Sequence, residues 1–260
     1  MELQQKLKSQ IPKNREWFGE WFDSPYYHIL YKHRDNKEAK VFIDNLIDYF
    51  QFKTSDSIQD LACGKGRHSI YLNKKGYDVV GLDLSHKNID FAKKFENERL
   101  LFHVHDMRFP WQGKSFDYIL NLFTSFGYFE TKGENQQSIG AIAKSLKNDG
   151  RILIDFLNPF TVINNLVPEE TKYVNGIEFH IRKFIKGEYI IKDIRFEDNG
   201  KTFNFQERVK AIRRVRFLEY FRNADLEVAD LFGDYQLKPY IAEKSERMIF
   251  VLRKKHGNSI

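Results

Sequence analysis

Seven consecutive residues, Asp60-Leu61-Ala62-Cys63-Gly64-Lys65-Gly66, combine an acid with two glycines at a spacing that can hold a ligand. They follow a short apolar run and precede a segment of helical character. Glycines at such a turn let a ligand approach the backbone closely, and the free N–H groups at the start of a helix point toward anionic or polar ligand atoms. A tight strand-to-helix turn would explain the same residues, so the function depends on what surrounds them.

Two further acids stand at the ends of the next two predicted strands. Asp83 ends YDVVGLD, 19 residues after Gly64, where nucleotide-binding sheets place an acid that accepts from both hydroxyls of a ribose. Asp106 ends LLFHVHD, where its carboxylate can accept from an adenine amino group with Met107 against the ring. The carboxyl ends of parallel strands share one edge of a sheet, so we expect these acids to meet the glycine loop there.

The expected ligand is an adenosyl compound that carries no phosphate. A dinucleotide site favours Gly or Ala at position 69, where this chain has Ser69. Asp60 at the entrance of the loop disfavours a pyrophosphate and suits an ammonium group. S-adenosylmethionine combines an ammonium group, a ribose diol and an adenine, and it is therefore the predicted cofactor.

The elements that must position these residues have the order of an α/β protein. Strands and helices alternate from residue 57 to 157, which predicts a parallel sheet covered on both faces; one of the helices is predicted over 135–148, ending before Asp149-Gly150. Short alternating runs with turns at Asn175-Gly176 and Asn199-Gly200 then predict an antiparallel flap. We divide the chain into an N-terminal helical lid (1–52), a cofactor-binding core (53–160), a flap insertion (161–212) and a C-terminal part of the core sheet (213–260).

Four segments together resemble the class I S-adenosylmethionine-dependent methyltransferases, most closely the small-molecule type that includes sugar N-methyltransferases. They are IQDLACGKGRHSIYL, YDVVGLDLS, VHDMRFPWQGKSFDYILNLFTSFGYF and SERMIFVLRK. The resemblance covers residues 26–160 well and 213–255 loosely. It implies a Rossmann-like, mostly parallel sheet of seven strands whose last strand, RMIFVLRK, is antiparallel.

The resemblance also implies cofactor contacts at particular positions. Asp60 orients the loop near the methionine amine, Asp83 holds the ribose, and Asn121 lies near the methionine moiety. Lid residues close over the cofactor, and Arg34 pairs with its carboxylate. The full set of predicted cofactor-binding residues is Tyr27, Tyr31, Arg34, Asp60, Ala62, Gly64, Gly66, Asp83, Leu84, Asp106, Met107 and Asn121.

Methyl transfer is an in-line displacement on an already activated sulfonium, so the protein mainly supplies alignment and a dry site. No catalytic residue can be assigned from the sequence. His28 and His33 in the lid are candidates for a base, and Asp155 and Asn158 after the fifth strand are candidates for the acceptor pocket. We expect no metal site, because His103 and His105 share a strand face without a clear third ligand.

Composition limits the remaining alternatives. The chain of 260 residues has one Cys, and no run of 18 apolar residues suggests a membrane helix. No secretory signal is recognised, so we expect a cytoplasmic monomer or homodimer that acts on a small molecule. Of the net charge of +6, residues 201–260 hold 13 − 8 = +5, which leaves open an RNA methyltransferase, although nucleic acid is the less favoured partner. A non-catalytic nucleotide-binding protein is the third alternative.

Overall fold

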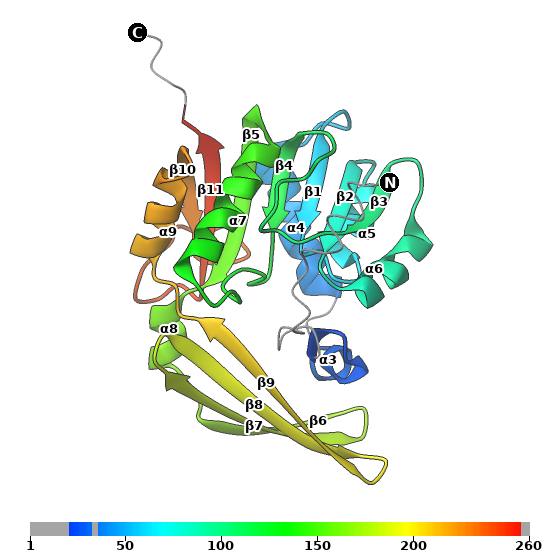
Figure 1. Cartoon of the computed structure of the whole chain (residues 1–260), viewed down its shortest axis with the longest axis vertical. Helices are drawn as coiled ribbons and strands as arrows, with labels where there is room; N and C mark the ends of the chain where they lie inside the picture. The colour runs from blue at the N-terminus through cyan, green and yellow to red at the C-terminus, as the bar shows by residue number, and fades with distance from the viewer. Residues whose placement is uncertain (1–20, 33–35, 256–260) are drawn as a thin grey trace.

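The main sheet of the computed structural model, which describes residues 21–32 and 36–255, has seven strands in the order β10-β11-β5-β4-β1-β2-β3 (Figure 1). β11 is antiparallel to both of its neighbours, and the pairs β5–β4, β4–β1, β1–β2 and β2–β3 are parallel. The predicted Rossmann-like sheet with an antiparallel last strand is therefore confirmed. Its strands are β1 (Ser57–Leu61), β2 (Asp78–Asp83), β3 (Leu100–Val104), β4 (Phe116–Asn121), β5 (Leu146–Leu157), β10 (Leu226–Phe232) and β11 (Arg247–Lys254).

Helices cover both faces of this sheet because its central strands are apolar on both sides. All five residues of β1 are buried, with Ile58 on one face and Leu61 on the other. One apolar cluster joins the sheet to α7 (Lys132–Ser145) and α9 (Arg214–Arg222), and the other joins it to α4 (Asn36–Phe50), α5 (Arg67–Lys74) and α6 (His86–Ala92). Two short helices, α8 (Pro159–Asn164) and η1 (Lys93–Phe95), follow β5 and α6 in the chain.

The helix predicted over 135–148 is displaced toward the N-terminus. α7 begins at Lys132. Thr131, just before the helix, and Glu134, in its first turn, form a reciprocal capping box. It ends at Ser145, and the next residue already belongs to β5, where Leu146 is buried and pairs with Phe116 of β4. Burial of that leucine in the core and its pairing on the sheet thus take precedence over its helical propensity.

The flap is a separate antiparallel sheet of four strands in the order β6-β7-β8-β9. Its strands are β6 (Glu169–Val174), β7 (Ile177–Lys186), β8 (Tyr189–Asp198) and β9 (Lys201–Lys210). Asn175 and Asn199 have φ angles of 51° and 49°, and a glycine follows each of them. These left-handed pairs are the turns that the Asn-Gly dipeptides predicted.

The described part of the range 1–52 lies in two layers rather than one. α3 (Pro25–Leu30) packs against one face of the flap, where Trp21 and Leu30 join a cluster that contains Phe179 and Phe196. α4 packs against the main sheet instead (Figure 1). Residues 1–20 and 33–35 of the predicted lid lie outside the described residues.

Candidate active site

The glycine loop between β1 and α5 has a backbone that few side chains tolerate. Ala62, Gly64 and Gly66 have φ angles of 63°, 57° and 79°. A methyl group added at Gly66 would stand 2.6 Å from the ring of Phe102, which leaves no room for a side chain. The same addition at Gly64 would meet nothing within 4 Å. The loop is therefore packed against the protein at Gly66 and open at Gly64.

Asp60 is buried at the end of β1 and holds the start of α5. Its Oδ2 accepts from the backbone N–H of Ser69 at 3.1 Å and from the Ser69 hydroxyl at 2.5 Å. Burial raises the pKa of Asp60 from 3.8 to about 6, against the lowering effect of these hydrogen bonds and of Arg67. Ser69, which weakened the dinucleotide interpretation of the sequence, thus has a structural role beside this acid.

Asp83 connects the end of β2 to the glycine loop. Its Oδ2 accepts from the N–H of Gly64 at 2.8 Å, and its Oδ1 accepts from the N–H of Ser85 at 2.8 Å. Burial raises the pKa of Asp83, and these hydrogen bonds oppose the shift. The side chain of Asn88 also forms a hydrogen bond with Asp83, and a carboxylate with about four acceptor positions still has room for a ligand donor. Asp83 is also close enough to Asp60 to raise the pKa of Asp60.

Asn121 ends β4, the strand on the other side of β1. Its side-chain amide donates to the carbonyl of Leu61 at 3.0 Å, which ties the two strand ends together. Its Oδ1 is buried and accepts no hydrogen bond from residues 21–32 or 36–255. A buried acceptor without a donor is costly, so this atom marks a place where a ligand N–H would be stabilised.

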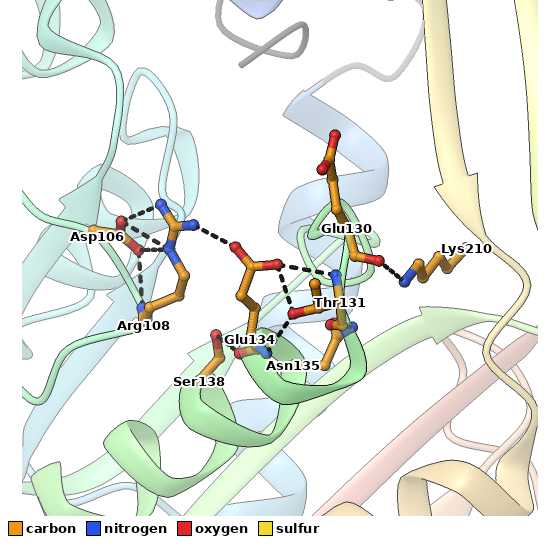
Figure 2. A network of polar contacts seen from close by, with 8 residues as sticks. All are labelled: Asp106, Arg108, Glu130, Thr131, Glu134, Asn135, Ser138 and Lys210. Carbon is orange, nitrogen blue, oxygen red and sulfur yellow. Dashed lines mark hydrogen bonds and ion pairs between the residues drawn. The ribbon is translucent and has the colours of Figure 1, made fainter. Parts of the chain in front are cut away.

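Asp106 follows β3 and forms an ion pair that the sequence did not predict. Arg108 contacts both of its oxygens, and the same guanidinium reaches Glu134 at the start of α7 (Figure 2). The neighbouring Met107 is half-buried against the core cluster on the α7 face. Leu84, next to Asp83, is also half-buried.

The lid reaches the site through Asp23 and through His28, one of the two predicted candidates for a base. The Ser85 hydroxyl donates to Asp23, which precedes α3. His28 of α3 lies close enough to Lys65 of the glycine loop for that lysine to lower its pKa, which burial and Lys65 together bring to about 4. α3 is therefore adjacent to both the loop and the end of β2, and His28 is uncharged at neutral pH.

The two predicted lid tyrosines are held by the lid and the flap. The Tyr31 hydroxyl donates to Glu207 of β9 at 2.6 Å, and Lys192 of β8 donates to that hydroxyl. The ring of Tyr27 contacts those of Trp21, Phe22, His28 and Tyr31. Both rings pack against the apolar cluster that α3 shares with the flap. Arg34 and His33 lie outside the described residues.

The two candidates for the acceptor pocket are engaged in structural contacts. Asp155 is fully buried and forms an ion pair with Arg247 at 2.6 Å. Asn158 caps α8 and donates to the carbonyls of Ala242 and Ser245, both at 2.8 Å. These contacts give both side chains a structural role, and a contact of either with the acceptor stays a prediction.

The loop after β4 has a strained backbone, which no residue pattern in this segment predicts. Phe123 and Thr124 have φ angles of 56° and 59°, and such conformations cost about 1–3 kcal/mol each for residues other than glycine. The Phe123 N–H donates to Asp155 at 2.7 Å, and the Arg247 guanidinium donates to the Thr124 hydroxyl at 2.8 Å. Strain of this kind gathers at functional sites, and here it follows directly after Asn121.

The donor and acceptor set fits S-adenosylmethionine better than a phosphate ligand. Asp60 and the free Asn121 Oδ1 are acceptors suited to an ammonium group, and Asp83 can accept from a diol. The space at Gly64 admits a ligand close to the backbone. Among residues 21–32 and 36–255, no group of three metal-ligating side chains is assembled, and none of the helices is long and apolar enough to cross a membrane.

Comparison with known proteins agrees with this geometry. The profile of a family described as "Methyltransferase domain" matches residues 58–150. The putative methyltransferase YqeM of Bacillus subtilis is 34% identical over 210 residues, which are 76% of this chain and 83% of that protein. A dTDP-3-amino-3,4,6-trideoxy-alpha-D-glucopyranose N,N-dimethyltransferase of Streptomyces venezuelae is 28% identical over 86% of this chain and 94% of its own length. An S-adenosylmethionine-dependent methyltransferase structure from Clostridium acetobutylicum superposes with a TM-score of 0.75 at 19% identity, covering 89% of this chain and 96% of that one.

Proposed function

Because this chain belongs to the class I S-adenosylmethionine-dependent methyltransferases, we propose that it transfers the methyl group of S-adenosylmethionine to a nucleophilic atom of a small molecule by in-line displacement. The observation that carries this proposal is the convergence of Asp60, Asp83 and the unpartnered Asn121 Oδ1 at the ends of three adjacent parallel strands. The bound cofactor supplies an activated methyl sulfonium. The protein then has to bind, orient and exclude water.

We assign the binding roles by chemical complementarity. Asp60 and the Oδ1 of Asn121 accept from the ammonium group, and Asp83 accepts from the ribose hydroxyls. Asp106 accepts from the adenine amino group, with Met107 and Leu84 beside the ring. Ala62, Gly64 and Gly66 shape the backbone surface on which the cofactor lies. His28 and the lid residues lie beside the glycine loop and limit its access to water.

The relative from Streptomyces venezuelae acts on an amine of a nucleotide-linked sugar, and this makes amino sugars the first acceptor class to test. We place the protein in the cytoplasm, where its one cysteine, the buried free thiol Cys63, remains reduced. The direct test incubates the protein with cofactor labelled on the methyl group and either a small-metabolite extract or total RNA. Label in a small molecule supports the proposal. Label in RNA alone, or heat of binding from NAD and none from S-adenosylmethionine, would contradict it.

Replacing Asp83 by alanine is expected to weaken S-adenosylhomocysteine binding about 5- to 150-fold, because a charged hydrogen-bond partner contributes about 1–3 kcal/mol. Isothermal titration measures this change. The matched control is Asp78→Ala at the opposite end of β2, where the carboxylate pairs with Lys114 on the surface at 2.6 Å. Equal affinities in the two variants would rule out the ribose-binding role.

Cofactor affinity is expected to fall between pH 7 and pH 5. The pKa of Asp60 is about 6 in the folded protein, and only the ionised carboxylate holds an ammonium group. At pH 5 the dissociation constant of S-adenosylhomocysteine should be about tenfold higher than its limit at high pH. Asp60→Asn should bind S-adenosylhomocysteine more weakly than the wild type. Its affinity should no longer show the fall between pH 7 and pH 5 that Asp60 causes.

The same pKa has the opposite effect on the stability of the ligand-free protein. A carboxyl whose pKa is raised by folding binds more protons in the folded state between about pH 4 and pH 6, so its contribution to stability increases as the pH falls through this window. Thermal unfolding of the wild type and of Asp60→Asn at several pH values isolates that contribution. A wild type that loses stability relative to Asp60→Asn as the pH falls through this window would contradict a raised pKa of Asp60. An acid-induced fall in affinity that persists in Asp60→Asn would exclude Asp60 as the titrating group.

A further inference from the structure

The guanidinium of Arg108 joins the acid after β3 to the first turn of α7 (Figure 2). Its Nε lies 3.1 and 3.0 Å from the two oxygens of Asp106, and its Nη2 lies 2.7 Å from Oδ2. Its Nη1 donates to Oε1 of Glu134 at 2.8 Å. The Arg108 side chain is buried and also lies over the ring of Phe129, 5.0 Å from its centre. A fork shared by two carboxylates fixes the orientation of both.

Glu134 is itself held by the capping box of α7. Its second oxygen, Oε2, accepts from the N–H of Thr131 at 2.9 Å and from the Thr131 hydroxyl at 2.8 Å. Glu130, the residue before Thr131, accepts at its backbone carbonyl from the side chain of Lys210 at the end of β9. Neither the helix start nor the glutamate can turn without breaking these contacts. The orientation of the Asp106 carboxylate is therefore set by residues 25 to 28 positions further along the chain.

The hydrogen bonds already made by Asp106 define what else it can bind. It accepts from three donors: the N–H of Arg108 at 2.9 Å, its Nε and its Nη2. The single Nε hydrogen is shared between the two oxygens, and a carboxylate has about four acceptor positions, so a further donor can bind without displacing Arg108. An ionised carboxylate cannot donate, and it therefore disfavours a ligand that presents another acceptor at that position.

We propose that Arg108 and Glu134 are positioning residues that aim Asp106 at the 6-amino group of the cofactor's purine, and that they thereby make the site selective for a 6-aminopurine over a 6-oxopurine. The inference rests on the proposed function, since it concerns the adenosyl end of the same site. Neither residue touches the cofactor in this account. Each acts through the carboxylate of Asp106.

The experiment compares two ligands that differ only at this group. S-adenosylhomocysteine and its 6-oxopurine analogue, S-inosylhomocysteine, are titrated calorimetrically into the wild type, Asp106→Asn, Arg108→Lys and Glu134→Gln. We expect the wild type to bind S-adenosylhomocysteine at least about 30-fold more tightly than S-inosylhomocysteine. The 6-oxo group cannot donate to Asp106, so the carboxylate would be left without that hydrogen bond. In Arg108→Lys the ammonium group cannot replace the planar guanidinium that contacts both carboxylates. In Glu134→Gln the negative charge that pairs with Arg108 is lost. Both variants should therefore lower the ratio of the two ligand affinities at least about fivefold.

Thr131→Ala is the matched control. It removes the hydroxyl of the capping box and should lower stability by about 1 kcal/mol, a shift of a few degrees in melting temperature. In this variant Glu134 keeps the backbone N–H of residue 131 on its Oε2 and Arg108 on its Oε1. Its carboxylate therefore stays oriented, and the ratio of the two affinities should equal that of the wild type. A general loss of helix stability would change the melting temperature in all variants and leave the ratio unchanged.

Each result distinguishes the inference from the function on which it rests. If folded Arg108→Lys or Glu134→Gln keeps the wild-type ratio, the positioning role is wrong. Should Arg108→Lys fail to fold, Glu134→Gln decides alone, because its side chain is 28% exposed and tolerates an isosteric change. Equal binding of both ligands by the wild type would refute the inference and leave the methyltransferase proposal standing. Binding of neither ligand would contradict the proposed function itself.

Discussion

Arg247→Met is expected to lower the free energy of unfolding by about 3–5 kcal/mol, the cost of leaving a buried charge without its partner. Asp155 is 0% exposed, and Arg247 contacts its Oδ1 through Nε at 2.8 Å and through Nη2 at 2.6 Å. Methionine preserves much of the apolar stem but supplies no charge. Two hydrogen bonds to Asp155 remain, from the Phe123 N–H at 2.7 Å and the Tyr235 hydroxyl at 3.3 Å, and they do not neutralise the carboxylate.

Urea unfolding gives this free energy, and the same strand provides the control. Arg253, also on β11, pairs with Glu227 at 2.6 Å, but both side chains are about two-fifths exposed. Exposed pairs contribute about 0–1 kcal/mol, so Arg253→Met should shift the midpoint little. Equal losses in the two variants would mean that burial of Asp155 does not determine the cost. Arg247→Met should also loosen the strained loop, because Arg247 donates to the Thr124 hydroxyl and to the Asp155 carboxylate that holds the Phe123 N–H.

Gly66→Ala is expected to destabilise the fold by about 2–5 kcal/mol. About 1–2 kcal/mol comes from the left-handed backbone, with φ at 79°, and about 1–3 kcal/mol from overpacking. The new methyl group would stand 2.6 Å from the Phe102 ring. That ring is fully buried and lies equally close to Gly81, where an added Cβ would be 2.5 Å away. Because the Phe102 ring is closely packed on these sides, it cannot easily move away from the new methyl group.

Gly64→Ala separates the effect of the backbone from the effect of the space. Its φ of 57° carries a similar conformational cost, but the added methyl group meets no protein atom within 4 Å. The expected loss of stability is about 1–2 kcal/mol, whereas cofactor affinity should fall because the methyl group occupies the proposed binding surface. Thermal unfolding and titration with S-adenosylhomocysteine measure the two effects. An unfolding free energy equally low in both variants, with cofactor binding by Gly64→Ala unaffected, would contradict this division of the loop.

The contacts of α3 suggest how access to the site is arranged. Trp21, Tyr26 and Tyr31 donate to Glu207 or Asp198 of the flap, while Asp23 accepts from Ser85 beside the end of β2. The helix is thus bonded through several side chains to the flap and through fewer contacts to the core. α3 and the flap also share one apolar cluster.

The sequence by itself determined the alternation of strands and helices, the hairpin turns of the flap and the places where acids end strands. These properties are local or periodic: they follow from apolar runs, from Asn-Gly dipeptides and from residues at the boundary of an element. Asp60, Asp83 and Asn121 could be proposed for the site on this ground, since consecutive parallel strands bring their carboxyl ends to one edge.

Only the tertiary structure decided which of these groups are already bound to other side chains. Arg108 with Glu134, Arg247 with Asp155, and Glu207 with Tyr31 are separated by 26, 92 and 176 residues. No periodicity or turn signal encodes such pairs, because they depend on how helices, flap and sheet pack after each element has formed. For the same reason the sequence located the acids of the candidate site correctly on their strands but could not show which lone pairs remain free for a ligand.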